Sequence, residues 1–447
     1  MDIIIGMLVT FGILIFSIYK GIFVAIPLLI GLFIFTFISW KRGFSLKAIC
    51  RMSFNGGKKA FVVLKIFILI GAITAVWMAA GTVPGIVYYG IKLMNPSYFI
   101  LYAFLISSSV SFLLGTSLGT VSTVGLALIV MAKGGNVDLN VAAGAIIAGA
   151  YFGDRCSPMS SSANLVANLT ETTIFTNIRN MFASSAIPFI ISIILYTFFS
   201  LRQPLSFTGS SIDSEILHSF HVNWLVLLPA ILIVVFSVFK INVKISMFSS
   251  ILIAAMLSAF IQHRSMTDII HYLFFGFYLN SDNPLYSIIK GGRIISMWQA
   301  SLVVYVSCSL AGIFDGTNML KSVEKILSRA KTHAEIFVYT TGVSIVTAAF
   351  GCNQSMSVVL TNQLMTNPYK EKKLANYKLA LDLENTSIVL SALIPWNIAA
   401  FVPTTTMDVS PVGFIPYAFY LYLIPLSCIL TFKSSGMNYC NLGSTKE

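Results

Sequence analysis

Long apolar runs separated by short polar segments recur along the whole chain. We predict fourteen such runs, at 3–18, 22–40, 60–80, 98–114, 117–131, 141–178, 181–201, 224–238, 245–262, 298–314, 336–350, 351–366, 384–406 and 413–432. A helix needs roughly 20 apolar residues to cross the hydrocarbon core of a bilayer, and most of these runs approach or exceed that length. The pattern therefore predicts an all-α polytopic membrane protein with about 12–14 transmembrane segments.

Composition supports this fold class and excludes others. Of 447 residues, 57% are hydrophobic and 10% are charged, whereas soluble domains contain roughly 25% charged residues. The net charge of +12 does not indicate a nucleic-acid partner, because the basic residues lie between apolar runs, as the positive-inside rule describes for cytoplasmic loops. The six cysteines are scattered without a metal-site or disulfide spacing, so we expect no cofactor and no resident metal.

Glycine and proline breaks fall at matching places in two halves of the chain. The matching residues are 235, 236 and 237 positions apart, and they are Gly81 and Gly316, Gly115 and Gly351, and Pro158 and Pro395. A broken helix survives in a bilayer only where protein or a wet cavity satisfies the freed backbone groups. Internal repeats with interrupted helices are typical of secondary transporters.

The loops suggest that the two halves have opposite orientations. The segment 41–59 contains six basic residues and no acid, while its counterpart near 282–293 contains only two basic residues and an aspartate. The bias reverses later, since Lys92 and Lys133 stand alone but their counterparts at 321–331 and 370–378 each carry four basic residues. We therefore predict inverted-topology repeats, with 41–59, 321–331 and 370–378 on the cytoplasmic side.

These patterns divide the chain into four parts. We predict a first transmembrane repeat at 1–201, composed of two lead-in spans and a broken-helix unit, and an extramembrane linker at 202–223. A second, inverted repeat follows at 224–433, and a cytoplasmic tail at 434–447. We expect both termini on the cytoplasmic side of the inner membrane, and a homodimer is one assembly compatible with the sequence.

The first break carries an unusual concentration of polar side chains. Asp154 and Arg155 directly follow an apolar run, and Ser157, Ser161 and Asn164 lie within the next turns. A charge at the bilayer centre costs roughly 2.5–3.5 kcal/mol even on lenient scales. Asp154 is therefore a candidate for ion or proton binding, although an ion pair between Asp154 and Arg155 that only stabilises packing is the alternative.

Three further polar clusters accompany it. Glu384 and Asn385 precede a break that ends at Asn397, and Glu384 either binds ions or caps a helix at the interface. Thr116 and Ser117 join two apolar runs in the first half, where small residues serve either ion binding or close helix packing. Asn353 holds the equivalent place in the second half. Sodium prefers oxygen ligands and a proton needs a carboxylate, so these clusters suit a cation and proton site.

At these residues the chain resembles the NhaC family of Na⁺/H⁺ antiporters. The matching stretches run in the family's order from about residue 70 to residue 425, and they are 81–84 (GTVP), 115–117 (GTS), 149–155 (GAYFGDR), 157–158 (SP), 164–165 (NL), 393–397 (LIPWN) and 416–419 (PYAF). The chain departs from the family at three positions, where Ser161, Asn353 and Asn385 replace aspartates. Neutral oxygens still ligate sodium, but charge balance and proton coupling must change.

The resemblance implies a Na⁺ or Li⁺/H⁺ antiporter that works by alternating access. Asp154 and Glu384 would carry ion and proton, and the neutral ligands or scaffold would be Thr116, Ser117, Ser157, Asn164, Asn353, Asn385 and Asn397. A second hypothesis is a Na⁺- or H⁺-coupled transporter of an organic acid or amino acid, with Arg155 pairing a substrate carboxylate. A channel or non-transporting membrane protein is a third, which the interrupted, repeated segments oppose. We expect no enzymatic activity, because no nucleophile–base set is visible.

Overall fold

The computed structural model describes residues 2–206, 212–286, 288–292, 294–317, 327 and 332–434. Within these ranges every regular element is a helix, and the only strand pairing is an isolated bridge between Phe277 and Gly291. The predicted all-α class is confirmed. The tail from 435 onward and most of the basic segment 321–331 lie outside the described residues.

The first half of the chain contains eleven α-helices and a π-helix, η2, among its described residues. Their bounds are α1 (Asp2–Tyr19), α2 (Ala25–Lys41), α3 (Leu46–Lys58), α4 (Phe61–Ala79), α5 (Thr82–Leu93), α6 (Phe99–Leu114), α7 (Ser117–Thr120), η2 (Val121–Gly125), α8 (Leu126–Gly134), α9 (Leu139–Cys156), α10 (Ser161–Leu169) and α11 (Ile174–Arg202). The short helix η1 (Pro96–Tyr98) lies between α5 and α6, and α12 (Ile212–Ser219) follows α11.

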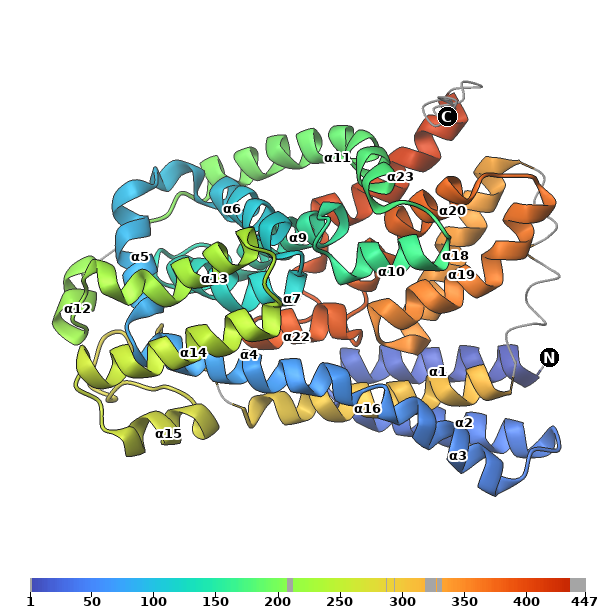
Figure 1. The fold of residues 1–447 in the computed structure, drawn as a ribbon, viewed down its shortest axis with the longest axis horizontal. Helices are drawn as coiled ribbons and strands as arrows, with labels where there is room; N and C mark the ends of the chain where they lie inside the picture. Colours follow the sequence, from blue (N-terminus) through green and yellow to red (C-terminus); the bar gives the residue numbers. More distant parts are fainter. Residues whose placement is uncertain are drawn as a thin grey trace.

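The second half follows the same order. Its described elements are η3 (Trp224–Leu227), α13 (Leu228–Val238), α14 (Val243–Phe260), α15 (Met266–Phe275), α16 (Ser296–Gly316), α18 (His333–Gly351), α19 (Gln354–Glu371), α20 (Asn376–Leu383), the π-helix η4 (Glu384–Ile388), α21 (Val389–Ser391), α22 (Ile398–Met407), η5 (Ile415–Tyr417) and α23 (Phe419–Ser434). Figure 1 shows α4 and α16 in the lower part of the molecule and α11 across the top.

Helix boundaries repeat at a constant spacing. The starts of α7, α9 and α10 precede the starts of α19, α20 and α22 by 237 positions each. Gly115 and Cys352, also 237 apart, both have left-handed backbone angles, with φ of 65° and 45°. The π-helices break this correspondence, because η2 follows α7 whereas η4 follows α20. The halves therefore share an order of elements, and their opposite orientation in the membrane stays a prediction.

The two halves pack against each other reciprocally. Helices α2 and α3 contact α16 of the second half, and α14 and α15 contact α4 of the first half. Helices α4 and α16 also touch each other. In Figure 1 the pair α2 and α3 lies at the right end and α14 with α15 at the left end. Such an exchange of flanking helices is what a two-fold related pair of repeats would produce.

Fewer helices meet the criteria for a membrane span than the sequence predicted. Within the described ranges, six helices are long and apolar enough to cross a bilayer, or up to eight if each of two bent pairs is one span. The prediction of about 12–14 segments was too high by this measure. The difference arises because several predicted segments are helices of 10–17 residues, such as α2 and α22, or are interrupted.

The run 141–178 is interrupted at the predicted break, since α9 ends at Cys156 and α10 begins at Ser161. Two other predicted boundaries need correction. The segment 84–94, taken as a loop, is helix α5, which bends by 66° from α4. The basic segment 41–59 contains α3. Hydropathy did not reveal α3 because the helix is amphipathic: its apolar and charged residues lie on different faces, so the segment as a whole is not apolar.

Candidate functional site

The two breaks are built by side chains that bond to freed backbone groups. Asn164 Nδ2 donates to the carbonyl oxygens of Pro158 and Ser160, at 3.0 and 2.7 Å. Ser157 Oγ accepts from the backbone N–H of Met159 at 3.1 Å. In the second half, Asn397 caps α22, and its Nδ2 donates 2.8 Å to the carbonyl of Ala348 in α18. These residues stabilise the broken helices.

Asp154 lies at the end of α9 and is 4% exposed. Ser117 Oγ donates to its Oδ2 at 3.0 Å, and Ser160 Oγ donates to its Oδ1 at 3.1 Å. Gln354 Nε2 lies 3.4 Å from Oδ2 and also donates 2.9 Å to Ser162 Oγ. An ionised carboxylate only accepts hydrogen bonds, so three donors fit that form of Asp154.

The donors to Asp154 stand at the beginnings of three different helices. Ser117 is the first residue of α7, Ser160 is the N-cap of α10, and Gln354 is the first residue of α19. Helix N-termini carry partial positive charge and favour a nearby anion. The carboxylate of Asp154 thus lies where helices of both halves begin, which is a feature that only the folded chain creates.

Glu384 opens the π-helix η4 and has no measurable exposure. Neither of its carboxylate oxygens has a hydrogen-bond partner among the described residues. The carboxylate interacts electrostatically with Arg155 and with Asp154. A buried carboxylate without donors is unfavourable when ionised, unless a cation or a proton neutralises it. Two acids that are far apart in sequence therefore share one buried environment.

Arg155 is fully buried between the two acids' helices. Its guanidinium bonds to groups of α11, η4 and α23, namely the side chains of Ser184, Ser185, Asn385 and Tyr420 and the carbonyl oxygens of Met181 and Glu384. The distances include 2.8 Å to Ser184 and 3.1 Å to Tyr420. All these partners are neutral groups, so Arg155 does not form the hydrogen-bonded ion pair with Asp154 that the sequence left open.

The predicted site residues separate into distinct groups. Ser117 donates a hydrogen bond to Asp154, and Asn385 accepts one from Arg155. The Nδ2 atom of Asn385 also donates to Cys428 Sγ at 3.3 Å. Thr116 and Asn353 act as N-caps, at 3.4 Å from Gly119 N and 2.9 Å from Ser355 N respectively. The structure brings Asp154, Glu384, Arg155, Ser117 and Asn385 together, while Ser157, Asn164 and Asn397 belong to the breaks.

Several polar residues near the site were not predicted. Ser160 and Gln354 contact Asp154, and a buried set of hydroxyls surrounds η4 and α18. In this hydroxyl cluster the oxygen–oxygen distances lie between 2.8 and 3.1 Å; its members are Ser344, Thr347, Ser357, Thr361, Thr386 and Ser387. The helical spacing of Ser344 and Thr347 on one face of α18 was the available signal.

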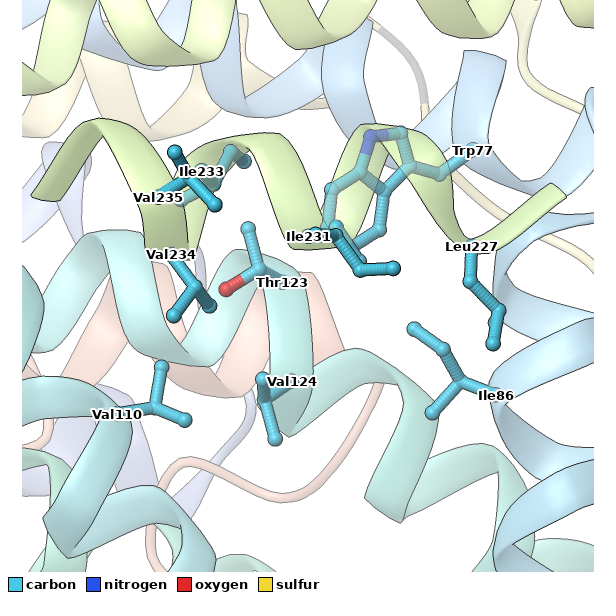
Figure 2. Close-up of a pocket in the computed structure, with 11 residues that line it drawn as sticks. Trp77, Ile86, Val110, Thr123, Val124, Leu227, Ile231, Ile233, Val234 and Val235 are labelled. Carbon is cyan, nitrogen blue, oxygen red and sulfur yellow. The ribbon is translucent and has the colours of Figure 1, made fainter. Parts of the chain in front are cut away.

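An apolar cavity of about 310 Å³ lies away from these residues. Trp77, Thr123 and side chains of α5, α6, η3 and α13 line it, and Thr123 supplies the hydroxyl group visible in the close-up (Figure 2). Trp77 Nε1 is bonded to Ser250 Oγ at 2.9 Å. A bare cation needs several oxygen ligands, so this cavity does not suit the ion that the clustered acids suit.

Comparison with known proteins places these features in context. Residues 149–433 match the Na⁺/H⁺ antiporter family. The malate-2H⁺/Na⁺-lactate antiporter of Bacillus subtilis (strain 168) is 28% identical over 414 residues, covering 89% of this chain and 87% of that protein. The Na⁺/H⁺ antiporter NhaC of Alkalihalophilus pseudofirmus is 28% identical over 398 residues, covering 86% and 82%. The arginine/ornithine antiporter ArcD of Halobacterium salinarum is 26% identical over 382 residues, covering 83% and 77%.

Proposed function

Because this chain belongs to the Na⁺/H⁺ antiporter family, we propose that it exchanges Na⁺ or Li⁺ for protons across the cytoplasmic membrane by alternating access. The family match agrees with the resemblance of the sequence motifs to the NhaC antiporters. It covers both polar breaks, the acids Asp154 and Glu384, and the hydroxyl cluster. The remaining question is how these side chains would exchange one cation for another.

The charges of the buried cluster supply the first argument. Asp154, Arg155 and Glu384 are each at most 4% exposed, and their combined charge is −1 when all three are ionised. Leaving a net charge in a medium of low dielectric constant is costly, so one positive charge should accompany the cluster. Either a monovalent cation or a proton can provide it. Competition of the two for a single negative charge is the basis of an exchanger.

The two acids would have different roles in ion binding and in exchange. Asp154 already has three donors, and the hydroxyl oxygens of Ser117 and Ser160 beside it offer further ligands to a dehydrated cation. Glu384 has none, so its carboxylate accepts either a proton or a cation without first losing a protein partner. The fully buried carboxylate of Glu384, which has no hydrogen-bond partner in the described part of the chain, is the observation that carries the proposal. We therefore assign ion ligation to Asp154 and the exchangeable charge to Glu384.

The experiment is a direct test of ion-driven proton movement. Purified protein is placed in liposomes that contain a pH-sensitive dye, and Na⁺, Li⁺ and K⁺ are added in turn. We expect proton efflux with Na⁺ or Li⁺, and its loss in both Glu384→Gln and Asp154→Asn. Glu371→Gln, which changes an exposed acid at the end of α19, is the matched control. Wild-type exchange by Glu384→Gln would show that this assignment is wrong.

The relatives provide a second candidate, exchange of a small organic solute. One of them is named a malate-2H⁺/Na⁺-lactate antiporter and another an arginine/ornithine antiporter. In this hypothesis Arg155 would bind a substrate carboxylate, but its guanidinium is already occupied by neutral partners. A panel of organic and amino acids in the same liposomes separates the candidates. Solute-driven proton flux without any response to Na⁺ or Li⁺ would favour this second function.

A further inference from the structure

A second group of buried titratable side chains lies near one end of α18, apart from Asp154 and Glu384. Asp382 of α20 is 3% exposed. Its Oδ2 atom accepts a hydrogen bond of 2.6 Å from the hydroxyl of Tyr369 in α19. The same oxygen lies 3.0 Å from Nε2 of His333, the first residue of α18. One carboxylate oxygen thus joins three helices, and the mechanism above does not use it.

This group, which we call the His–Asp–Tyr cluster (His333, Asp382 and Tyr369), is more exposed at His333 than at its other two members. The side chain of His333 is 17% exposed and that of Asp382 is 4% exposed. Tyr369 is buried and its hydroxyl lies 3.1 Å from Thr340 Oγ1. A proton from solvent therefore meets the imidazole first and the carboxylate second.

The cluster is directly connected to the segment that carries Glu384. Asp382 lies two residues before Glu384, at the point where α20 continues into η4. The carbonyl oxygen of Asp382 accepts 2.6 Å from Thr386 Oγ1, and Thr386 is bonded to Ser344 of α18 at 2.9 Å. Holding Asp382 thus helps to hold η4 against α18. π-helices are rare, and those that occur often lie at functional sites. Because Glu384 is the first residue of η4, the contacts that fix η4 also fix the position of Glu384.

We propose that His333, Asp382 and Tyr369 form a second proton-binding site, and that its protonation state sets how firmly the π-helix with Glu384 is held. This inference rests on the proposed exchange of cations for protons. Histidine is the side chain that titrates closest to neutral pH. Protonated His333 forms an ion pair with Asp382, whereas neutral His333 retains at most a hydrogen bond. The cluster therefore holds α20 more tightly at acidic pH and less tightly at alkaline pH.

Several charged residues lie on the described elements next to the cluster. From α18 the exposed Glu335 follows His333, and from α11 the exposed Arg179 lies on a helix packed against α20. Cys428 of α23 is in electrostatic contact with Asp382. The end of α19 adds Lys370 and Glu371, the connection to α20 adds Lys372 and Lys373, and α20 adds Lys378.

The test compares pH profiles of exchange in the dye-containing liposomes, at starting pH values between about 5 and 8.5. For wild type we expect the exchange rate to rise with pH. His333→Gln keeps a hydrogen-bonding side chain but does not titrate, so the rise should shrink to the part that proton competition at Glu384 produces. His333→Lys stays charged and should be slow across the whole range. His271→Gln, which changes an exposed histidine of α15, should retain the wild-type profile.

Thermal stability gives a second readout that does not depend on transport. The ion pair exists only while His333 is protonated, so the stability it contributes is present at acidic pH and lost as pH rises. We expect the melting temperature of wild type to fall over this range more than that of His333→Gln. Wild-type profiles of both rate and melting in His333→Gln and Asp382→Asn would overturn the inference. Wild-type exchange by Glu384→Gln would instead overturn the proposed function.

Discussion

Replacing Arg155 by lysine separates a structural role of this residue from substrate binding. Both side chains are cationic, so the net charge of the buried cluster is unchanged. Arginine presents five N–H donors in a planar fork, while lysine presents three from a single atom. The guanidinium reaches acceptors on α11, η4 and α23 at once. An ammonium group in the same place cannot satisfy acceptors on all three elements.

The expected loss follows from those contacts. A hydrogen bond to a charged group contributes about 1.5–3 kcal/mol, and breaking a buried charged network costs about 3–5 kcal/mol. Arg155 is completely buried, and its partners Ser185, Asn385 and Tyr420 are buried or nearly so. No solvent would replace the missing donors. We therefore expect Arg155→Lys to lower the free energy of unfolding by about 3–5 kcal/mol.

The assay measures the protein that remains monodisperse in detergent after heating, for wild type and Arg155→Lys. Arg179→Lys, which changes an exposed arginine on α11, is the matched control and should melt like wild type. Solute uptake and Na⁺-driven proton flux are measured on the same preparations. If Arg155→Lys melts like wild type but loses only the uptake of a carboxylate solute, Arg155 is a substrate ligand and our structural interpretation is wrong.

Three further predictions follow from packing, charge and topology. Gly153→Ala should destabilise the protein by about 1–3 kcal/mol, because an added Cβ would lie 2.2 Å from backbone atoms of α6. The control Gly342→Ala has open space around the added Cβ and should melt like wild type. Equal melting curves for the two variants would refute the prediction. Asn385→Asp should change ion selectivity or the pH dependence of flux in the liposome assay more than Ser161→Asp does. The reason is that Asn385 is buried in contact with Arg155, whereas Ser161 is exposed. Equal flux profiles for the two variants would contradict this prediction. Single cysteines labelled with an impermeant reagent should divide five segments between the two sides of the membrane. We expect 41–59, 321–331 and 370–378 to face the cytoplasm, and helix α5 (84–94) and 282–293 to face the opposite side. Labelling of both members of a pair from one side would exclude inverted repeats.

The breaks of the fold were predictable because they depend on local chemistry. Gly115 adopts the left-handed angle that glycine adopts readily, and Asn397 caps the helix that follows it. The number of spans was not predictable, since a hydropathy run does not tell a continuous helix from a bent or short one. Helix α5 illustrates this, because a bend of 66° separates it from α4 within one apolar region. The π-helices had no sequence signal that we could use.

The site was predictable only in part. Asp154 and Glu384 stood out because charges are expensive in a membrane, and both are buried. Gln354 could not be assigned to Asp154, since 200 residues separate them and only tertiary packing brings α19 to the end of α9. The saturation of Arg155 was equally invisible, because its partners come from three segments whose relative positions the sequence does not specify.

The three positions where aspartates of the family are neutral here have different surroundings, and this determines what each loss means. Ser161 begins α10 and is exposed, so the charge of an acid there would be screened by solvent. Asn353 caps α19 at a half-buried position, so the charge of an acid there would interact favourably with the helix N-terminus. Asn385 is 1% exposed and bonded to Arg155. An ionised aspartate there would lie against Arg155 and change the net charge of the cluster from −1 to −2. We therefore attribute to Asn385, more than to the other two, the single negative charge for which one cation and one proton would compete.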